Sequence, residues 1–214
     1  MPRTEPFDTH GERYEDWFER HLAAYESELL ALRAFVPIEG RGLEIGVGSA
    51  RFAAPLGVAT GIDPSMAMLT RARARGIEVV AACAEALPFC AASFDHVLIV
   101  TTLCFADSPA KMLAEAHRVL TCGGRIVIGF IDRNSPIGQD YLAHQHESVF
   151  YRDASFYSAA EVEDLLRAAG FHIEGWGQTL SQPLAGITHI EALRPGRGTG
   201  AFLVVAATRD DAAA

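Results

Sequence analysis

The chain has 214 residues, of which half are hydrophobic and 21% are charged, so it can form one domain with a buried core but not two full ones. Its 27 acidic and 18 basic residues give a formal net charge of −9, which disfavours nonspecific binding to nucleic acid or to an anionic membrane. A small-molecule substrate is the simpler expectation.

The sequence contains no stretch of roughly 20 apolar residues that could span a bilayer. The N-terminal residues lack the apolar run of a signal peptide. Four cysteines are scattered without zinc-ligand spacing, and we expect them to be reduced thiols in or near the core: Cys83, Cys90, Cys104 and Cys122. We therefore expect a cytoplasmic monomer or homodimer that holds no metal.

Residues 12–34 predict one N-terminal helix, because apolar side chains recur in it at helical spacing and Pro37 and Gly40 follow its end. Its first turns place four ring-bearing residues on one face: Tyr14, Trp17, Phe18 and His21. Such a helix can simply pack on the domain, and it can also close over a bound ligand. The sequence is compatible with both roles.

Short apolar runs and helical stretches alternate after this helix, which predicts an α/β fold with a mostly parallel sheet and helices on both of its faces. The expected strands are 42–46, 58–62, 77–81, 95–100, 124–130, 171–179 and 201–207. No clear helix joins the last two strands, so we expect them to form a closing antiparallel hairpin at the sheet edge.

Three helix starts carry recognisable capping signals. Ser65 can cap the helix that ends before residue 76, and Ser108 is followed by Pro109, which suits the first helical position. Ser158 and Glu161 form a capping box ahead of an apolar run. These signals support the predicted alternation of strands and helices.

The first predicted strand runs through Glu44 into a Gly46-Val-Gly48 turn. A dinucleotide site would need the pattern G-x-G-x-x-G, whose third glycine is missing here. A carboxylate at Glu44 would also repel a pyrophosphate, whereas it would suit a ligand that carries an ammonium or sulfonium cation. The turn could alternatively do no more than reverse the chain.

Asp63 ends the second predicted strand, seventeen positions after Gly46. An acidic residue about 20 positions after a glycine turn is placed to accept hydrogen bonds from the two ribose hydroxyls. The alternative is a carboxylate that interacts with the N-terminus of the helix after Ser65. The glycine turn ahead of Asp63 favours the ribose.

Several segments, in order, resemble class I S-adenosylmethionine-dependent methyltransferases. Glu44-Ile-Gly46-Val-Gly48-Ser-Ala50 resembles their motif I, and Gly61-Ile-Asp63-Pro64-Ser65 resembles their motif II. Cys83-Ala84-Glu85-Ala-Leu-Pro-Phe89 is similar to the D-A-E-x-L-P-F segment of the quinone-biosynthesis-like, or type 11, branch. Further similarity extends through 94–100, 115–120 and 123–128, so the match covers about residues 42–131.

The resemblance implies a seven-stranded Rossmann-like sheet of order 3-2-1-4-5-7-6 with the last strand antiparallel. It also implies S-adenosyl-L-methionine as cofactor and S-adenosyl-L-homocysteine as product. Glu44 and the Gly46-Val47-Gly48 backbone would face the methionine part, and Asp63 would bind the ribose beside Pro64 and Ser65. Cys83, Ala84 and Glu85 would lie along the adenine.

Two positions depart from the family pattern. Ala50 replaces a third glycine, which a methyl group permits only if the backbone angles there are ordinary. Cys83 stands where the family often has an aspartate that accepts from the adenine amino group, and a thiol is a weak partner. Adenine recognition would then depend more on backbone groups and on apolar contact from Leu87 or Met66.

Candidate acceptor-side residues come from three parts of the chain. Thr101 and Thr102 follow the fourth strand, where we expect Thr101 on the cofactor side, although it could merely end the strand. The segment 132–157 mixes aromatic and titratable groups as a lid would. The substrate candidates are Tyr14, Trp17, Thr102, Asp132, Tyr141 and Tyr151.

Candidate general bases are His144, His146 and Tyr151. The two histidines are two positions apart and would lie on different helical faces, so both are not expected in one pocket. For either histidine alone, exposure to solvent is favoured over a role as base. His-x-His also hints at a metal, but no third ligand is evident.

We predict methyl transfer from S-adenosylmethionine to a small molecule. The alternatives are a nicotinamide-dependent oxidoreductase on a Rossmann sheet and a non-catalytic S-adenosylmethionine-binding protein. Residues 1–214 would form one methyltransferase domain. Its expected parts are N-terminal capping helices in 1–40, a cofactor-binding half in 41–131, a substrate-side lid in 132–157, and a C-terminal helix with strands in 158–209.

Overall fold

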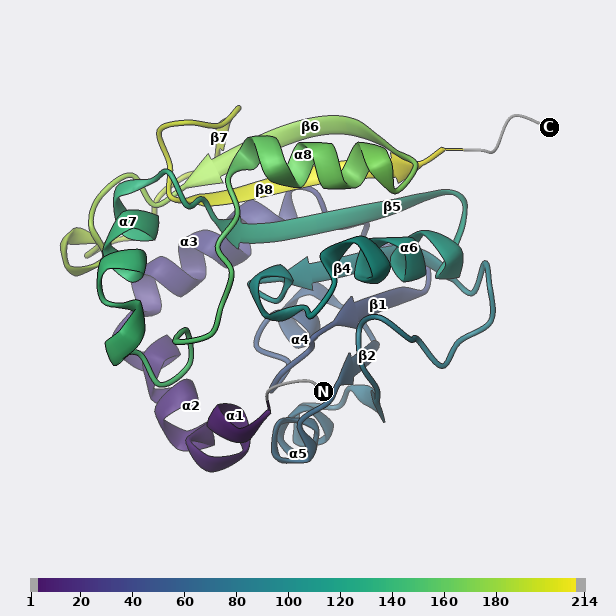
Figure 1. Ribbon diagram of the computed structural model, residues 1–214, viewed down its shortest axis with the longest axis horizontal. Coiled ribbons are helices and arrows are strands. Elements are labelled where there is room, and N and C mark those ends of the chain that lie inside the picture. The colour runs from purple at the N-terminus through teal and green to yellow at the C-terminus, as the bar shows by residue number, and fades with distance from the viewer. Residues whose placement is uncertain (1–3, 211–214) are drawn as a thin grey trace.

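The computed structural model describes residues 4–210 and has one mixed sheet with helices packed around it (Figure 1). The strands are β1 (Gly42–Ile45), β2 (Thr60–Asp63), β3 (Glu78–Ala81), β4 (Phe94–Val100), β5 (Leu120–Ile131), β6 (Phe171–Thr179), β7 (Arg194–Pro195) and β8 (Phe202–Arg209). The α-helices are α1 (Glu5–Thr9), α2 (Gly11–Arg20), α3 (Leu22–Arg33), α4 (Ala53–Leu56), α5 (Met66–Ala74), α6 (Pro109–Val119), α7 (Pro136–Ala143) and α8 (Ala159–Ala168). Three short 3-10 turns complete the described elements: η1 (Leu103–Phe105), η2 (Gln145–Glu147) and η3 (Leu184–Gly186).

The sheet has the order β3-β2-β1-β4-β5-β8-β6-β7. The predicted order 3-2-1-4-5-7-6 is confirmed for the seven longer strands, and the two-residue β7 is an addition that pairs with β6. The expected closing hairpin is confirmed, since β6 and β8 pair antiparallel at this end of the sheet. Strand β8 lies between β5 and β6 and is antiparallel to both, which buries its apolar residues on both faces.

Successive residues of the central strands point to opposite faces and feed two separate cores. In β4, Leu98 packs with the cluster that includes Leu32 of α3. Its neighbour Ile99 packs with the cluster that includes Met112 of α6. This alternation follows from the two-residue period of a strand, and it explains why the runs that form these strands are apolar throughout.

The predicted helix caps are confirmed. The Ser65 side chain accepts from the Met68 amide and Ser108 accepts from the Lys111 amide. Ser158 and Glu161 form the expected capping box at the start of α8. Each cap satisfies amides that the first helical turn leaves without a partner.

The N-terminal helix was predicted as one element, but the structure divides it at His21. His21 has φ −118° and ψ 41°, which are not helical, and its ring nitrogen Nδ1 lies 3.0 Å from the Trp17 carbonyl oxygen. The Trp17 carbonyl oxygen also accepts the His21 backbone amide at 2.9 Å, so α2 keeps its last helical hydrogen bond and the break lies in the backbone angles of His21. The break lets α2 and α3 take different directions (Figure 1).

Two smaller expectations were also wrong. Strand β5 begins at Leu120 and not at residue 124, because Phe94 pairs with Leu120 and a register shift follows between Phe94 and His96. Cys90 and Cys122 are exposed, while Cys83 and Cys104 are half-buried, and within residues 4–210 no disulfide joins any of the four. No helix within residues 4–210 is long and apolar enough to cross a membrane.

The parallel strands β1, β4 and β5 end on the same side of the sheet. In Figure 1 these carboxyl ends point toward α7 and the N-terminal helices. In open α/β sheets, ligands bind in the crevice outside the carboxyl ends of the strands. The fold therefore places the expected site between the strand ends and these helices.

Candidate functional site

A cavity of about 480 Å³ lies at the carboxyl ends of the parallel strands, a size typical of small-molecule sites. Four parallel strands or their following loops contribute to it through Gly46, Asp63, Thr101 and Ile131. The predicted residues that line it are Tyr14, Trp17, Gly46, Gly48, Asp63, Pro64, Cys83, Ala84, Glu85, Thr101, Thr102, Tyr141, His144 and Tyr151. Five predicted residues are not part of this lining: Glu44, Val47, Ser65, Asp132 and His146.

The amides of the glycine turn are already donated within the protein. Those of Gly46 and Val47 both lie 2.8 Å from the Ile62 carbonyl oxygen, and that of Gly48 lies 2.9 Å from Oδ2 of Asp63. A turn that binds pyrophosphate needs such amides to point at the ligand. The following helix, α4, has four residues only. The turn is therefore poorly suited to a dinucleotide.

The turn needs glycine for space as well as for backbone conformation. Gly46 has φ +73°, and a Cβ added to it would lie 2.1 Å from Cγ2 of Thr102. A Cβ on Gly48 would lie 3.3 Å from the Tyr14 hydroxyl oxygen. Ala50 does not have the ordinary backbone angles on which its tolerance was expected to depend, since its φ is +65°. The turn keeps the left-handed conformation at Ala50 without a glycine.

Glu44 lies beneath the turn and does not line the cavity. Its side chain is buried, and burial raises the pKa of its carboxyl group well above the usual range. One oxygen, Oε2, is buried without a hydrogen-bond partner. Val47, the next predicted residue, is also buried and faces Gly61, where an added Cβ would be 2.6 Å from it.

Asp63 is held by two backbone amides. The Gly48 amide donates to Oδ2 at 2.9 Å and the Ser65 amide donates to Oδ1 at 2.8 Å. Burial nevertheless raises the pKa of Asp63, and the two hydrogen bonds oppose that shift. A carboxylate has about four lone-pair sites, so the two oxygens can accept further donors from the cavity. Ser65 itself donates to Asp8 at 2.6 Å and does not reach the cavity.

Cys83, Ala84 and Glu85 line the cavity beyond β3, as expected from their order in the sequence. The Glu85 carboxylate accepts from the Ser108 amide at 3.2 Å, which ties this segment to the start of α6. The apolar residues expected to contact the adenine, Leu87 and Met66, are not those that line the cavity. Leu87 is buried outside the cavity lining and Met66 is 56% exposed, whereas Met68 and Ile62 line the cavity.

Aromatic rings that the sequence did not single out complete the wall of the cavity. Phe7 of α1 contacts three other rings at centroid distances of 5.3–5.9 Å, those of Phe150, Phe105 and Tyr14. Tyr151 stacks on Phe105 at 5.6 Å and on Tyr141 at 5.3 Å. These rings join the N-terminal helices to the segment 132–157. No common spacing in the sequence relates them.

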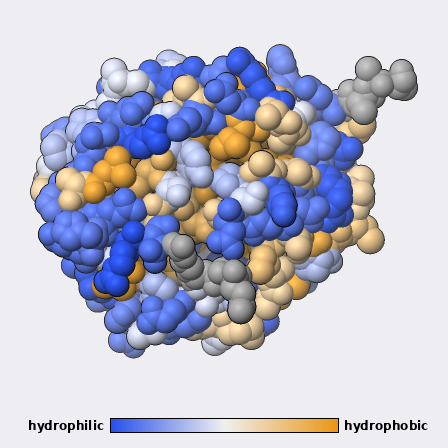
Figure 2. All heavy atoms as spheres, viewed as in Figure 1, coloured by the Kyte–Doolittle hydropathy of each residue, from blue (hydrophilic) through white to orange (hydrophobic). Residues whose placement is uncertain are grey.

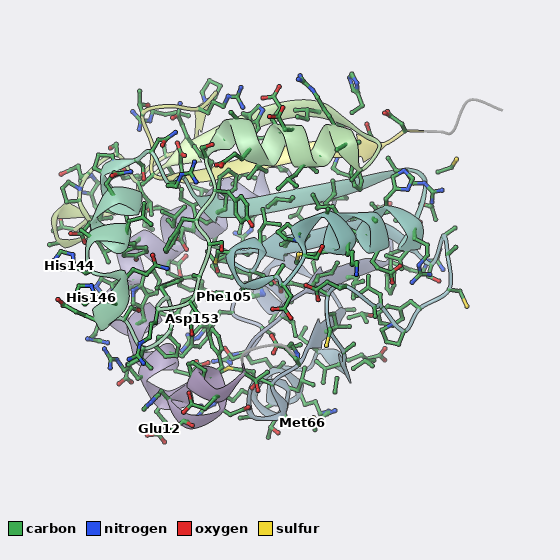
Figure 3. The ribbon with its side chains drawn as sticks, in the orientation of Figure 1. Glu12, Met66, Phe105, His144, His146 and Asp153 are labelled. Carbon is green, nitrogen blue, oxygen red and sulfur yellow. The ribbon has the colours of Figure 1, made fainter. Side chains whose placement is uncertain are left out.

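The candidate bases differ in their surroundings. His144 is at the rim, pairs with Asp140 and has a side chain 63% exposed, and His146 pairs with Glu147 on the surface. Figure 3 shows both histidines at the periphery near α7, whereas Phe105 lies nearer the strands. Burial raises the pKa of Tyr151 well above its usual value. Its phenol therefore stays protonated at neutral pH.

Asp132 stabilises a turn. It is buried, its amide donates to the Ala201 carbonyl oxygen at 2.8 Å, and its Oδ1 accepts from the Asn134 amide at 3.1 Å. Within residues 4–210, no group of three or more His, Cys, Asp or Glu side chains could hold a metal ion.

Glu28 is a cavity residue that the sequence analysis missed. It lies on α3, is 4% exposed and lines the cavity. Burial raises the pKa of its carboxyl group to about 8. The outer face shown in Figure 2 is mostly hydrophilic, with hydrophobic residues between the hydrophilic ones in its central part. An acidic residue on a helix is ordinarily part of such a hydrophilic surface, so no pattern in the sequence indicates that Glu28 is internal.

The motif residues at the strand ends and the sheet order define a Rossmann-like methyltransferase fold. The family model described as "Methyltransferase domain" matches residues 43–128. A crystal structure from Thermotoga maritima, described as an S-adenosylmethionine-dependent methyltransferase and possible histamine N-methyltransferase, is 43% identical. That similarity covers 97% of this chain and 100% of the other, with a TM-score of 0.94. The chain belongs to the class I S-adenosylmethionine-dependent methyltransferase family.

Other relatives are similar over nearly the whole chain. An uncharacterized protein of Methanocaldococcus jannaschii is 43% identical over 203 residues, which cover 95% of this chain and 98% of the relative. One of Mycobacterium tuberculosis is 40% identical over 220 residues, covering 99% of this chain and 76% of the relative. The [4+2]-cyclase SpnF, at 20% identity and a TM-score of 0.65 over 89% of this chain and 82% of its own, shares the fold alone.

Proposed function

We propose that this protein transfers the methyl group of S-adenosylmethionine to a small molecule bound in the same cavity. The observation that carries the proposal is the continuity of that cavity. Its lining includes the glycine turn, Asp63, an aromatic wall and Glu28. One continuous space thus offers surfaces for both a cofactor and an acceptor.

The residues at the β1 and β2 ends suit the cofactor. Asp63 is oriented by two amides and would accept hydrogen bonds from the ribose, with Pro64 beside it. Cys83, Ala84 and Glu85 would lie along the adenine. Gly46 and Gly48 leave room for the methionine part, since a side chain at either would meet Thr102 or Tyr14. The buried, unpartnered Oε2 of Glu44 leaves an acceptor beneath the turn, and a cationic ligand above it would favour the ionised form of this carboxyl group.

Bound S-adenosylmethionine supplies a methyl carbon that forms a bond to the acceptor as its bond to sulfur breaks and the electron pair stays on sulfur. Such a displacement needs alignment more than acid–base help, because the thioether leaves without a proton. The chain's contribution is to hold the acceptor and exclude water. Tyr14, Phe7 and Phe150 do so by packing the N-terminal helices on the segment 132–157.

We assign residues 41–131 to the cofactor half and 132–157 to the acceptor side within this proposal. The lining supports the division, since Tyr141, His144 and Tyr151 face the cavity from the second segment. The relative from Thermotoga maritima, described as a possible histamine N-methyltransferase, supports a small acceptor. Thr101, at φ +47°, would separate the two ligands at the end of β4.

Thermal-shift titration tests the cofactor directly. S-adenosylhomocysteine should raise the melting temperature in a saturable way, and NAD should not. Stabilisation by NAD alone would overturn the proposal in favour of an oxidoreductase. Because the cyclase SpnF shares the fold, a non-catalytic or non-methylating role is the second alternative. It predicts S-adenosylhomocysteine binding with no methyl transfer to any small molecule in a screen with labelled S-adenosylmethionine.

A further inference from the structure

Glu28 is a carboxylate that reaches the cavity from within the apolar core. It is 4% exposed on α3, where its neighbours along the helix, Ser27 and Leu29, are also buried. Its oxygens are not among the buried polar atoms that are wholly inaccessible, so they face the open space of the cavity. Glu44, in contrast, is sealed beneath the glycine turn.

Glu28 has no partner among the residues that the structure describes. Over residues 4–210, no side chain or backbone group forms a hydrogen bond or ion pair with its carboxylate, and its pKa is raised by burial alone. A buried carboxylate without a partner costs several kcal/mol of folding free energy. Titratable groups perturbed in this way and facing a cleft are typical of functional sites. The missing partner is a cation or a hydrogen-bond donor.

The rings near Glu28 favour a cation. Glu28 is close enough to Tyr141 and Tyr151 for its charge to contribute to the raised pKa values of both phenols. These two rings stack on each other at 5.3 Å with 22° between their planes. Aromatic faces beside a carboxylate attract an ammonium group through cation–π interaction and charge together. They also offer a flat surface to an aromatic or planar ligand.

The position of Glu28 separates it from the cofactor residues. Asp63 is at the end of β2, whereas Ile131, which lines the cavity at its other end, is at the end of β5. The sheet order places two strands between them, so these ends are about 14 Å apart at the usual strand spacing. Helix α3, which carries Glu28, packs on β5, and its Leu32 would lie 3.0 Å from a Cβ added to Gly129 of that strand. Glu28 therefore belongs to the end of the cavity away from the ribose carboxylate.

We propose that Glu28 binds the basic nitrogen of the methyl acceptor, and that this acceptor is a primary or secondary amine with an aromatic or planar body packed on Tyr141 and Tyr151. The assignment rests on the proposed methyl transfer. It adds the substrate class and the residue that selects it.

Glu28 also accepts the proton that an amine acceptor must lose before its nitrogen can be methylated. An ammonium nitrogen has no free electron pair, so it first transfers a proton to an oxygen of Glu28. The neutral nitrogen then forms its bond to the methyl carbon while the carbon–sulfur bond breaks, giving a methylated ammonium ion and S-adenosylhomocysteine. The proton on Glu28 leaves to water when the products dissociate. A carboxyl pKa of about 8 suits this acceptor role better than an ordinary one near 4.5.

The test uses three aromatic amines and the alcohols of matching shape: phenethylamine with 2-phenylethanol, tyramine with tyrosol, and tryptamine with tryptophol. Binding to the full chain saturated with S-adenosylhomocysteine is measured by calorimetry. The variants are Glu28→Gln, which keeps the shape and removes the charge, and Glu26→Gln, which removes an equal charge from the same helix outside the cavity. Methyl transfer to each amine is followed in parallel.

We expect at least one amine to bind the wild type and the E26Q control about ten- to hundredfold more tightly than its alcohol. E28Q should lose this preference while it keeps its affinity for S-adenosylhomocysteine. An equal preference in E28Q, or no preference for any amine in the wild type, would overturn the role of Glu28. Either result would leave the proposed function standing as long as S-adenosylhomocysteine binds. If E28Q does not fold, the comparison of amine with alcohol in the wild type decides alone.

Discussion

The carboxylate of Asp63 accepts a hydrogen bond from the Gly48 amide at 2.9 Å, so the residue that ends β2 fixes the turn that ends β1. The same carboxylate accepts from the Ser65 amide at 2.8 Å at the start of α5. Three segments of the cofactor side therefore depend on one side chain. This arrangement explains how the turn can be rigid while its amides remain turned away from the cavity.

Replacing Asp63 with Asn should weaken binding of S-adenosylhomocysteine about ten- to hundredfold, because a hydrogen bond to a charged group contributes about 1.5–3 kcal/mol. The amide would also present a donor where two backbone amides already donate. Calorimetric titration measures the affinity. Asp16→Asn is the control, because it removes an equal charge from the exposed face of α2. Wild-type affinity in D63N would contradict the role of Asp63 at the ribose.

Gly46→Ala should destabilise the fold by about 3 kcal/mol or more, because the added Cβ would lie 2.1 Å from Cγ2 of Thr102 at a φ of +73°. Gly57→Ala is a matched control. Gly57 has a similar φ of +75° but nothing within 4 Å of the added Cβ, so only the backbone cost of about 1–2 kcal/mol remains.

Urea unfolding of the two glycine variants distinguishes the energetic cost of the steric contact with Thr102 from the cost of the backbone conformation. Adding Thr102→Ala to G46A should recover part of the lost stability, since two of the three closest atoms belong to the end of that side chain. Equal losses in G46A and G57A would show that packing against Thr102 is unimportant.

The sheet and the cofactor side could be predicted because their signals are local. A glycine turn and a carboxylate at consecutive strand ends, Gly46 to Gly48 and Asp63, are read along one stretch of chain, and the order of parallel strands then brings them together. The helix caps were predictable for the same reason. The break at His21 was not, because a helical apolar pattern continues through it and only the backbone angles of His21 interrupt the helix.

The acceptor side was harder to predict because its parts are distant in sequence. Phe7, Phe105 and Phe150 meet only after the N-terminal helices pack on the segment 132–157, and no period relates them. Glu28 lies in a helix with other acidic residues, where a charge ordinarily faces solvent. Its burial depends on how α3 packs against β5, β6 and β8, which is a property of the tertiary fold.

Tyr151→Phe should keep binding of S-adenosylhomocysteine and methyl transfer to any accepted amine. Burial raises the pKa of the Tyr151 phenol well above its usual value, so this group does not accept protons near neutral pH. Tyr151→Ala should instead cost about 3–5 kcal/mol of stability, because it removes a ring stacked on Phe105 and Tyr141. Urea unfolding and initial rates measure the two effects. Loss of turnover in Y151F with intact folding would show that the hydroxyl takes part in the reaction.

Glu28 should make the stability of the ligand-free protein depend on pH. Its carboxyl pKa is raised from 4.5 to about 8 on folding, so between these values the unfolded chain releases a proton that the folded chain retains. Stability contributed by this group is therefore fully present below about pH 4.5 and falls as the pH rises toward 8. The total loss should be a few kcal/mol, since one pKa unit corresponds to about 1.4 kcal/mol.

The phenols that interact with Glu28, those of Tyr25, Tyr141 and Tyr151, do not titrate in this range, because burial raises the pKa of each above its usual value. Glu44 and Asp63 also have raised pKa values, but they are the same in wild type and Glu28→Gln, so the difference between the two proteins isolates Glu28. Urea unfolding at pH 5, 6, 7 and 8 should show that the free energy of unfolding of E28Q increases relative to that of the wild type by a few kcal/mol toward pH 8. Parallel stability curves would mean that Glu28 ionises as easily in the folded protein as in the unfolded chain, and that its burial imposes no cost for a bound amine to relieve.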